Sequence, residues 1–238
     1  MVRQVLVLAI VAQASPALAG IWTEDFTGSN GSTPTGWTIS TSNGSMDIQS
    51  NTLYMNSQGS GYAWGYPDKS SFPVLDDWDQ TLPYRVEFDF KIPNTNNHWF
   101  FVYVDSRVHT VIDYGDDFKY RAGTSSSASN VLIMELNTDQ WYSMQYDVFP
   151  AAGYFDIYVD NVLQTAGAGF LSQNRDPFHI GDRPRGNNED YDHGSAYWDN
   201  FQLTTNVPEP STLLVWTGLS VIGLVTLRRR RAAQAATG

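Results

Sequence analysis

Arg85-Val-Glu-Phe-Asp-Phe-Lys-Ile92 decides the fold class of this chain. Apolar and charged side chains alternate at every position of this stretch. Because successive side chains of a β-strand point to opposite faces, the alternation predicts a strand with one buried and one solvated face. The side chains expected on the buried face are Val86, Phe88, Phe90 and Ile92, and those expected on the other are Arg85, Glu87, Asp89 and Lys91.

Further strands are predicted on both sides of this stretch. They are Phe100–Val104, whose continuous apolar run suits a central strand, Trp141–Val148, a hairpin over Tyr154–Leu163 that turns at Asp160-Asn161, and Tyr197–Thr204. Loops rich in Gly, Ser, Asn and Pro separate them, and no helical periodicity appears between the two ends of the chain. The pattern predicts an all-β, antiparallel sandwich of two sheets.

Several segments resemble the concanavalin A-like (laminin-G-like) jelly rolls. They are Glu24–Gly28, Pro34–Trp37, Met46–Ile48, Asn51–Leu53, Tyr84–Phe90, Asp156–Leu163 and Tyr197–Phe201, so the resemblance spans most of Gly20–Thr205. It implies a jelly-roll sandwich, a fold that hosts lectins, carbohydrate-binding modules, glucanases and structural adhesion domains.

The N-terminal residues predict a secretory signal peptide over 1–19. Arg3 is followed by the apolar run Val5–Ala12 and by Ala17-Leu18-Ala19, a small-x-small cleavage site. We therefore expect export by the Sec route, with the sandwich domain occupying residues 20–206.

The C-terminal residues combine three features: the motif Val207, Pro208, Glu209, Pro210, the uncharged run Leu213–Leu227, and the cluster Arg228, Arg229, Arg230, Arg231. The run predicts a transmembrane helix over 213–227, with the arginines and the tail 232–238 in the cytoplasm. The whole of 207–231 resembles the PEP-CTERM sorting signal of Gram-negative bacteria. That resemblance implies an exosortase-type membrane protease as partner, transient insertion in the inner membrane, and delivery to the cell surface or extracellular matrix. The alternative is a plain single-span anchor.

Charge limits the partners of the domain. Five of the 14 Lys and Arg residues and one of the 25 Asp and Glu residues lie in the two terminal segments. The remaining 9 basic and 24 acidic side chains give the domain a net charge of −15. This excess argues against nucleic acid and anionic lipid. The chain has no cysteine, which excludes disulfides and thiol chemistry.

Glu87 and Asp89 form the best candidate pair of catalytic carboxylates. At i and i+2 on a strand they share a face about 6.5 Å apart, a spacing that glycoside hydrolysis can use. Laminarinase- and lichenase-type glucanases place their acids in a similar Glu-x-Asp-x-x-Glu pattern, but here Lys91 or Ile92 replaces the second glutamate. The alternative is a solvated strand face with balanced charges.

A structural calcium ion is implied by the same resemblance. In such jelly rolls an aspartate of the last strand often holds Ca²⁺ with oxygens near the first strand, which here would be Asp199 with Glu24 and Asp25. Alternatively, Asp199 caps its own backbone. The four histidines (His98, His109, His179 and His193) form no zinc motif.

Aromatic residues indicate glycan binding, because sugar rings stack on exposed aromatic side chains. Trp64 and Trp78 are the candidate ligand-binding residues, since they lie in a segment rich in Gly, Pro and Asp. Trp37, Trp141 and Trp198 stand in strand-like patterns and are expected to fill the core of the sandwich or to cap its ends. The sequence thus predicts a non-catalytic glycan-binding or adhesion module. The alternatives are a glycoside hydrolase that uses Glu87 and Asp89, and a purely structural matrix protein.

Overall fold

The computed structural model describes residues 21–71, 81–94, 98–104, 107–113, 117–124, 129–172, 178–184 and 194–205. Within these ranges the chain forms fourteen strands and one short 3₁₀ helix, η1 (Lys69–Ser71). The strands are β1 (Ile21–Glu24), β2 (Trp37–Gln49), β3 (Thr52–Pro67), β4 (Tyr84–Asn94), β5 (His98–Val104), β6 (Val108–Asp113), β7 (Asp117–Thr124), β8 (Ser129–Glu135), β9 (Trp141–Phe149), β10 (Tyr154–Val159), β11 (Val162–Gly169), β12 (Leu171–Ser172), β13 (Phe178–Pro184) and β14 (Gly194–Thr205).

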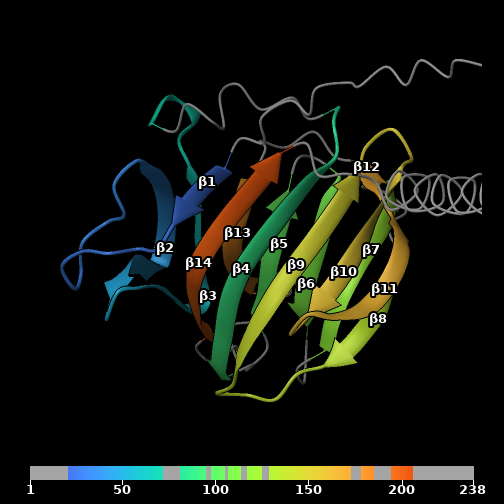
Figure 1. Cartoon of the computed structure of the whole chain (residues 1–238). Coiled ribbons are helices and arrows are strands. Elements are labelled where there is room, and N and C mark those ends of the chain that lie inside the picture. The colour runs from blue at the N-terminus through green and yellow to red at the C-terminus, as the bar shows by residue number, and fades with distance from the viewer. Residues whose placement is uncertain are drawn as a thin grey trace, which may run out of the picture.

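The strands lie in two layers (Figure 1). The first sheet has the order β11-β10-β9-β4-β14, and β1 pairs with the end of β14. The second sheet has the order β13-β5-β6-β7, and β8 pairs with β7. The predicted all-β sandwich is therefore confirmed, with a jelly-roll-like arrangement. The expectation of purely antiparallel pairing is wrong at one place among the described pairs, because β12 runs parallel to β7.

Strand β3 joins the two sheets. Its residues Leu53–Ser57 pair with β14, and its residues Ala63–Gly65 pair with β13. β2 follows β3 along both halves, with a register shift between Ser42 and Gly44. A side chain at Gly44 would overlap the carbonyl oxygen of Asn56, so the two strands can approach this closely only because glycine stands there.

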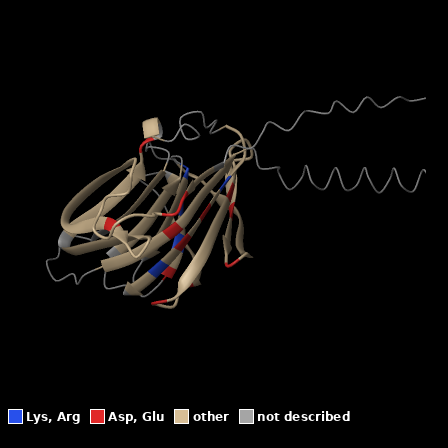
Figure 2. Cartoon of the chain, turned by 60° about the vertical axis from the view of Figure 1, so that its left-hand side comes forward, with Lys and Arg blue, Asp and Glu red and all other residues tan. Residues whose placement is uncertain are grey.

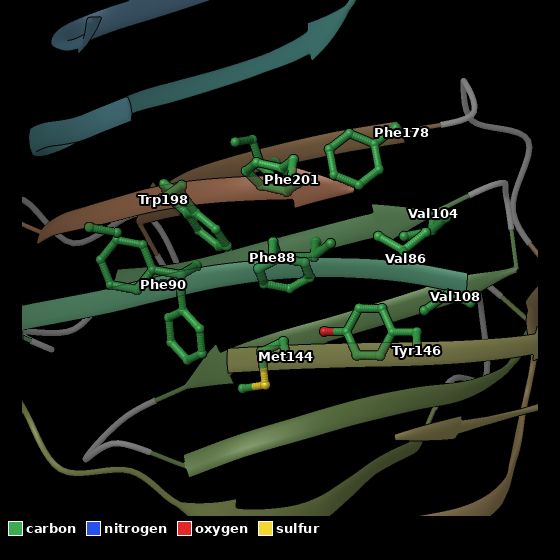
Figure 3. Packing of buried hydrophobic residues seen from close by; sticks show 14 of the residues in the cluster. Val86, Phe88, Phe90, Val104, Val108, Met144, Tyr146, Phe178, Trp198 and Phe201 are labelled. Atoms are coloured by element: carbon green, nitrogen blue, oxygen red, sulfur yellow. The ribbon is translucent and has the colours of Figure 1, made fainter. Parts of the chain in front are cut away.

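The two sheets enclose an aromatic core (Figure 3). Phe88 of β4 is 2% exposed and lies among four other rings. Its centroid lies 6.4 Å from that of Phe90, 5.6 Å from Tyr146, 5.7 Å from Trp198 and 5.2 Å from Phe201. The four apolar residues predicted on the inner face of β4 are all buried, which confirms the alternation.

A β-bulge in β14 allows Trp198 and Phe201 to point into the core together, although they are three residues apart. Both are 1% exposed. Between them Asn200 has φ 51°, and the register with β4 shifts at this point. Asn200 Nδ2 donates a hydrogen bond of 2.7 Å to Asp89 Oδ2 on β4. The extra residue therefore reorients the strand without removing either ring from the core.

The hairpin predicted over 154–163 is confirmed as β10 and β11. Asp160 and Asn161 have φ values of 50° and 62°, the left-handed conformation that a two-residue type I′ turn requires. Phe155, Ile157 and Val159 are buried on the inner face of β10.

Of the three tryptophans expected to fill the core or to cap its ends, Trp141 does not lie in the core. Trp37 and Trp198 are buried as predicted, but Trp141 is 42% exposed. Trp141 is in register with Lys91 on the outer face of β4, so the inner face of β9 begins at its neighbour, Tyr142. The period of two along β9 thus outweighs the general preference of tryptophan for burial.

The predictions for both ends of the chain lie outside the described residues. These are the signal peptide at 1–19, the sorting signal at 207–231 with its helix at 213–227, and the tail at 232–238. Inside the described ranges η1 is the only helix, and it is too short to cross a bilayer.

Replacing the central ring tests the core. We expect Phe88→Ala to lower the free energy of unfolding by about 3–5 kcal/mol, because it leaves a cavity between aromatic neighbours that cannot collapse. Urea unfolding followed by tryptophan fluorescence measures the change. The control is Val162→Ala, at a position 59% exposed, which should change stability by no more than about 0.5 kcal/mol. Similar losses in the two variants would contradict the central place of Phe88.

Candidate functional site

Glu87, one of the two candidate catalytic carboxylates, lies half-buried on the outer face of β4. Arg85, two residues earlier, donates two hydrogen bonds to Asp147 of β9, of 2.6 and 2.8 Å. Burial raises the pKa of Glu87, the positive charge of Arg85 lowers it, and the negative charge of Asp147 raises it. Basic and acidic positions lie next to one another on neighbouring strands of this face (Figure 2). Glu87 is thus an acid that retains its proton to a higher pH than an exposed glutamate.

Asp89, the other candidate, has different surroundings. It is in register with Asp199 across β4 and β14, and it accepts the hydrogen bond from Asn200. Glu87 therefore belongs to the Arg85–Asp147 group, whereas Asp89 belongs to the Asp199–Asn200 group.

The predicted calcium ligands lie where β1 meets β14. Glu24 accepts hydrogen bonds from the backbone N–H of Phe26 at 3.0 Å and from the indole Nε1 of Trp37 at 3.4 Å. Asp25 Oδ1 lies 3.4 Å from the backbone nitrogen of Thr27. Glu24 thereby holds the chain where it leaves the first strand.

Asp199 accepts a hydrogen bond of 2.8 Å from the backbone N–H of Asn200, which is the alternative that the sequence left open. Burial raises the pKa of Asp199, and the negative charges of Asp89 and Asp25 raise it further. In the part of the chain that the structure describes, no group of three or more His, Asp or Glu side chains is placed to hold a metal ion.

A cluster of rings lies on the outer face of the second sheet. Its members, here named the aromatic–histidine face, are Trp64, Tyr66, Phe101, Tyr103, His109 and His179. Trp64 and Tyr66 of β3 are half-buried and nearly parallel, with centroids 5.9 Å apart and an interplanar angle of 12°. His179 of β13 lies 5.8 Å from Trp64 and 4.7 Å from Tyr66. Trp64 is therefore part of a ring cluster, whereas Trp78 lies outside the described residues.

The centre of this face is a row across three strands. His179 is in register with Tyr103 of β5, and Tyr103 is in register with His109 of β6. The Tyr103 and His109 rings stack with centroids 3.9 Å apart. All three side chains are buried although they lie on an outer face, so the row is enclosed while Trp64 and Tyr66 at its rim are partly accessible.

Gly181 allows the rings to approach each other. It lies on β13 between Trp64 and Phe101. A side chain at this position would overlap the Phe101 ring and the Cβ of Trp64. The absence of a side chain therefore leaves the space that the two rings fill.

Basic groups lie on β7 of the same sheet. The guanidinium of Arg121 lies 5.9 Å from the centroid of Trp99, and Lys119 forms a 2.7 Å ion pair with Asp117. The sheet thus offers partly accessible aromatic rings and a guanidinium, groups that bind the C–H faces and hydroxyls of sugars.

The sequence analysis did not predict that His109 and His179 belong together. Their signal was the run Phe100–Val104, in which the residues of both strand faces are apolar. Phe101 and Tyr103 are buried on the outer face, so β5 buries apolar side chains on both of its faces. The sequence does not show which distant residues those outer rings meet, because β13 follows β5 only after a long stretch of chain.

The chain matches no protein-family model and no curated protein sequence. Solved structures do resemble it. A sialidase superposes with a TM-score of 0.53 at 12% identity, over 71% of this chain and 17% of the sialidase. A family 7 alginate lyase in complex with its product superposes with a TM-score of 0.48 at 8% identity, over 67% of this chain and 83% of the lyase. A third structure is of botulinum neurotoxin type C, a toxin whose cell entry depends on two ganglioside molecules. It superposes with a TM-score of 0.47 at 11% identity, over 75% of this chain and 46% of the toxin chain. The chain spans less than half of the sialidase and toxin chains, and the likeness to the sialidase supports the sandwich fold.

The raised pKa of Asp199 predicts how stability depends on pH. An acid whose folded pKa exceeds its ordinary value of 3.8 favours the folded state when protonated, so its ionisation lowers stability as pH rises through this region. We expect Asp199→Asn, measured in EDTA, to raise the thermal midpoint at pH 7 and to have no effect near about pH 3.

The control for that experiment removes a negative charge elsewhere. Glu135 is exposed on β8, so Glu135→Gln should leave the midpoint nearly unchanged at both pH values. A lower midpoint for Asp199→Asn at pH 7 in EDTA would contradict the inference that the half-buried charge of Asp199 destabilises the fold.

Proposed function

We propose that this chain is an exported surface or exopolysaccharide-matrix protein whose sandwich, of the concanavalin A-like class, is a non-catalytic glycan-binding or adhesion module. The observation that carries the proposal is the aromatic–histidine face. Trp64 and Tyr66 present two nearly parallel, partly accessible rings beside His179. Such an arrangement suits the apolar C–H face of a sugar ring with polar groups at its edge.

Delivery to the outside is a proposal from the sequence. The signal peptide at 1–19 would direct export, and the PEP-CTERM-like segment at 207–231 would bring the chain to an exosortase-type membrane protease. The net charge of −15 between the two signals suits a soluble domain among neutral glycans, and it disfavours nucleic acid and anionic lipid.

A glycoside hydrolase is the second candidate function. The observation that favours it is the raised pKa of Glu87, because a half-buried glutamate that retains its proton could act as a general acid. Asp89, held by Asn200, would then be the second carboxylate. A purely structural matrix protein, without a glycan site, is the third.

A structural calcium ion remains part of the proposal, with Asp199, Glu24 and Asp25 among its ligands. Burial and, to a smaller extent, the negative charges of Asp89 and Asp25 raise the pKa of Asp199, and a cation there would stabilise its ionised form. We expect 1 mM Ca²⁺ to raise the thermal midpoint of the EDTA-treated protein, since binding to the folded state alone stabilises it by mass action. In Asp199→Asn the calcium effect should disappear. An unchanged midpoint in the unsubstituted protein would contradict the calcium site.

Removing the Trp64 ring tests the glycan site. We expect the full-length chain, purified in detergent, to be retarded in affinity gels that contain laminarin, galactomannan or hydroxyethylcellulose. Trp64→Ala should weaken the binding of the retained glycan about tenfold, equivalent to ~1.4 kcal/mol. Trp64→Phe should keep most of the affinity, because it keeps a ring.

The matched control is Tyr158→Ala, which removes a half-buried ring from the outer face of the first sheet. It should bind as the unsubstituted chain does. Equal binding by the chain and Trp64→Ala would contradict the site. Release of reducing sugar that disappears in Glu87→Gln would replace the binding module by the hydrolase.

A further inference from the structure

A second row of rings crosses the outer face of the first sheet, on the opposite side of the sandwich from Trp64. The register of β3, β14, β4 and β9 places Tyr54 beside Tyr197, Tyr197 beside Lys91, and Lys91 beside Trp141. With neighbouring strands about 4.8 Å apart, the row is about 14 Å long. It is therefore longer than one sugar ring.

Each side chain of this row contacts the next one along the row. The Tyr54 and Tyr197 centroids are 4.9 Å apart. Lys91 Nζ lies 4.9 Å from the Tyr197 centroid and 5.7 Å from the Trp141 centroid, and it forms a 3.2 Å ion pair with Asp139. The ammonium group thus fixes two rings at a set spacing. We name these four residues, Tyr54, Tyr197, Lys91 and Trp141, the tyrosine–tryptophan row.

The row is open to solvent at one end. Trp141 is 42% exposed, and it is the only tryptophan in the described ranges with such exposure. A tryptophan normally buries most of its large apolar surface, so a ring held open by its neighbours calls for a partner that covers it.

The charges around the row define that partner. Asp89 and Asp199 face each other one row further along the same strands, and Asp139 pairs with Lys91. These carboxylates repel anionic polymers and membranes. The rings form a line one residue wide between polar side chains, which is too narrow for the apolar centre of a protein interface. A neutral polysaccharide fits, because its C–H faces stack on rings and its hydroxyls bond carboxylates.

We propose that the tyrosine–tryptophan row is a second binding site for a neutral polysaccharide chain. The proposal rests on the function proposed above. Because the two sites lie on opposite outer faces of one rigid sandwich, a single molecule can hold two polysaccharide chains and cross-link them. Linking two sites in this way strengthens attachment to a polymer without any new contact.

The test uses the full-length chain in detergent, with one copy per micelle checked by light scattering. The probes are the soluble glycans of the affinity gels. We expect the unsubstituted chain to cross-link the retained glycan, seen as a rise in light scattering of the mixture. Trp64→Ala and Trp141→Ala should each abolish cross-linking and still be retarded in gels, whereas the double variant should not be retarded.

The control on the same face is Gln145→Ala, four residues along β9 from Trp141. It should cross-link normally and melt at the same temperature. Cross-linking by Trp141→Ala equal to that of the unsubstituted chain would overturn the second site and leave the Trp64 site intact. Absence of retardation for every glycan would instead overturn the proposed function. If the unsubstituted chain associates and Trp141→Ala alone is a monomer, another copy of the chain covers the row. This result also overturns the inference.

Discussion

The packing of Phe88 against Trp198 and Phe201 is the constraint on which the rest of the structure depends. These rings come from adjacent strands of one sheet, and both β14 residues must point inward although their spacing does not suit a regular strand. The bulge at Asn200 resolves the conflict. The polar amide that forms it then binds Asp89, so the geometry of the outer carboxylates is set by the demands of the core.

The two candidate binding surfaces both arise because each sheet directs some rings into the core and others to its outer face. The sandwich core is complete with the inward residues of both sheets, and further rings remain on the outer faces. On the second sheet they close around a buried Tyr103–His109 pair, whereas on the first they stay spaced by Lys91. These rings outside the core are the observations from which the two binding sites are proposed.

Much of the fold could be predicted because strand periodicity is local. The alternation in β4 and the turn at Asp160-Asn161 both depend only on residues that are adjacent in the sequence. The exposure of Trp141 follows from its position in the alternation of β9 and not from its residue type. The aromatic–histidine face could not be predicted, since it depends on which strands are neighbours, and His109 and His179 meet only through β5. The environments of Glu87 and Asp89 likewise depend on residues of β9 and β14.

The position of β14 has a mechanical consequence. This last described strand is flanked by β4 on one side and by β3 and β1 on the other. In the proposed function, a polymer is held on the sheet and the chain is pulled from beyond Thr205. The resulting load acts along the axis of β14. Such a load shears the flanking ladders, so many hydrogen bonds must break together. Peeling from an edge would break them one at a time. Pairing of β14 on both sides would therefore resist force applied through the proposed surface tether.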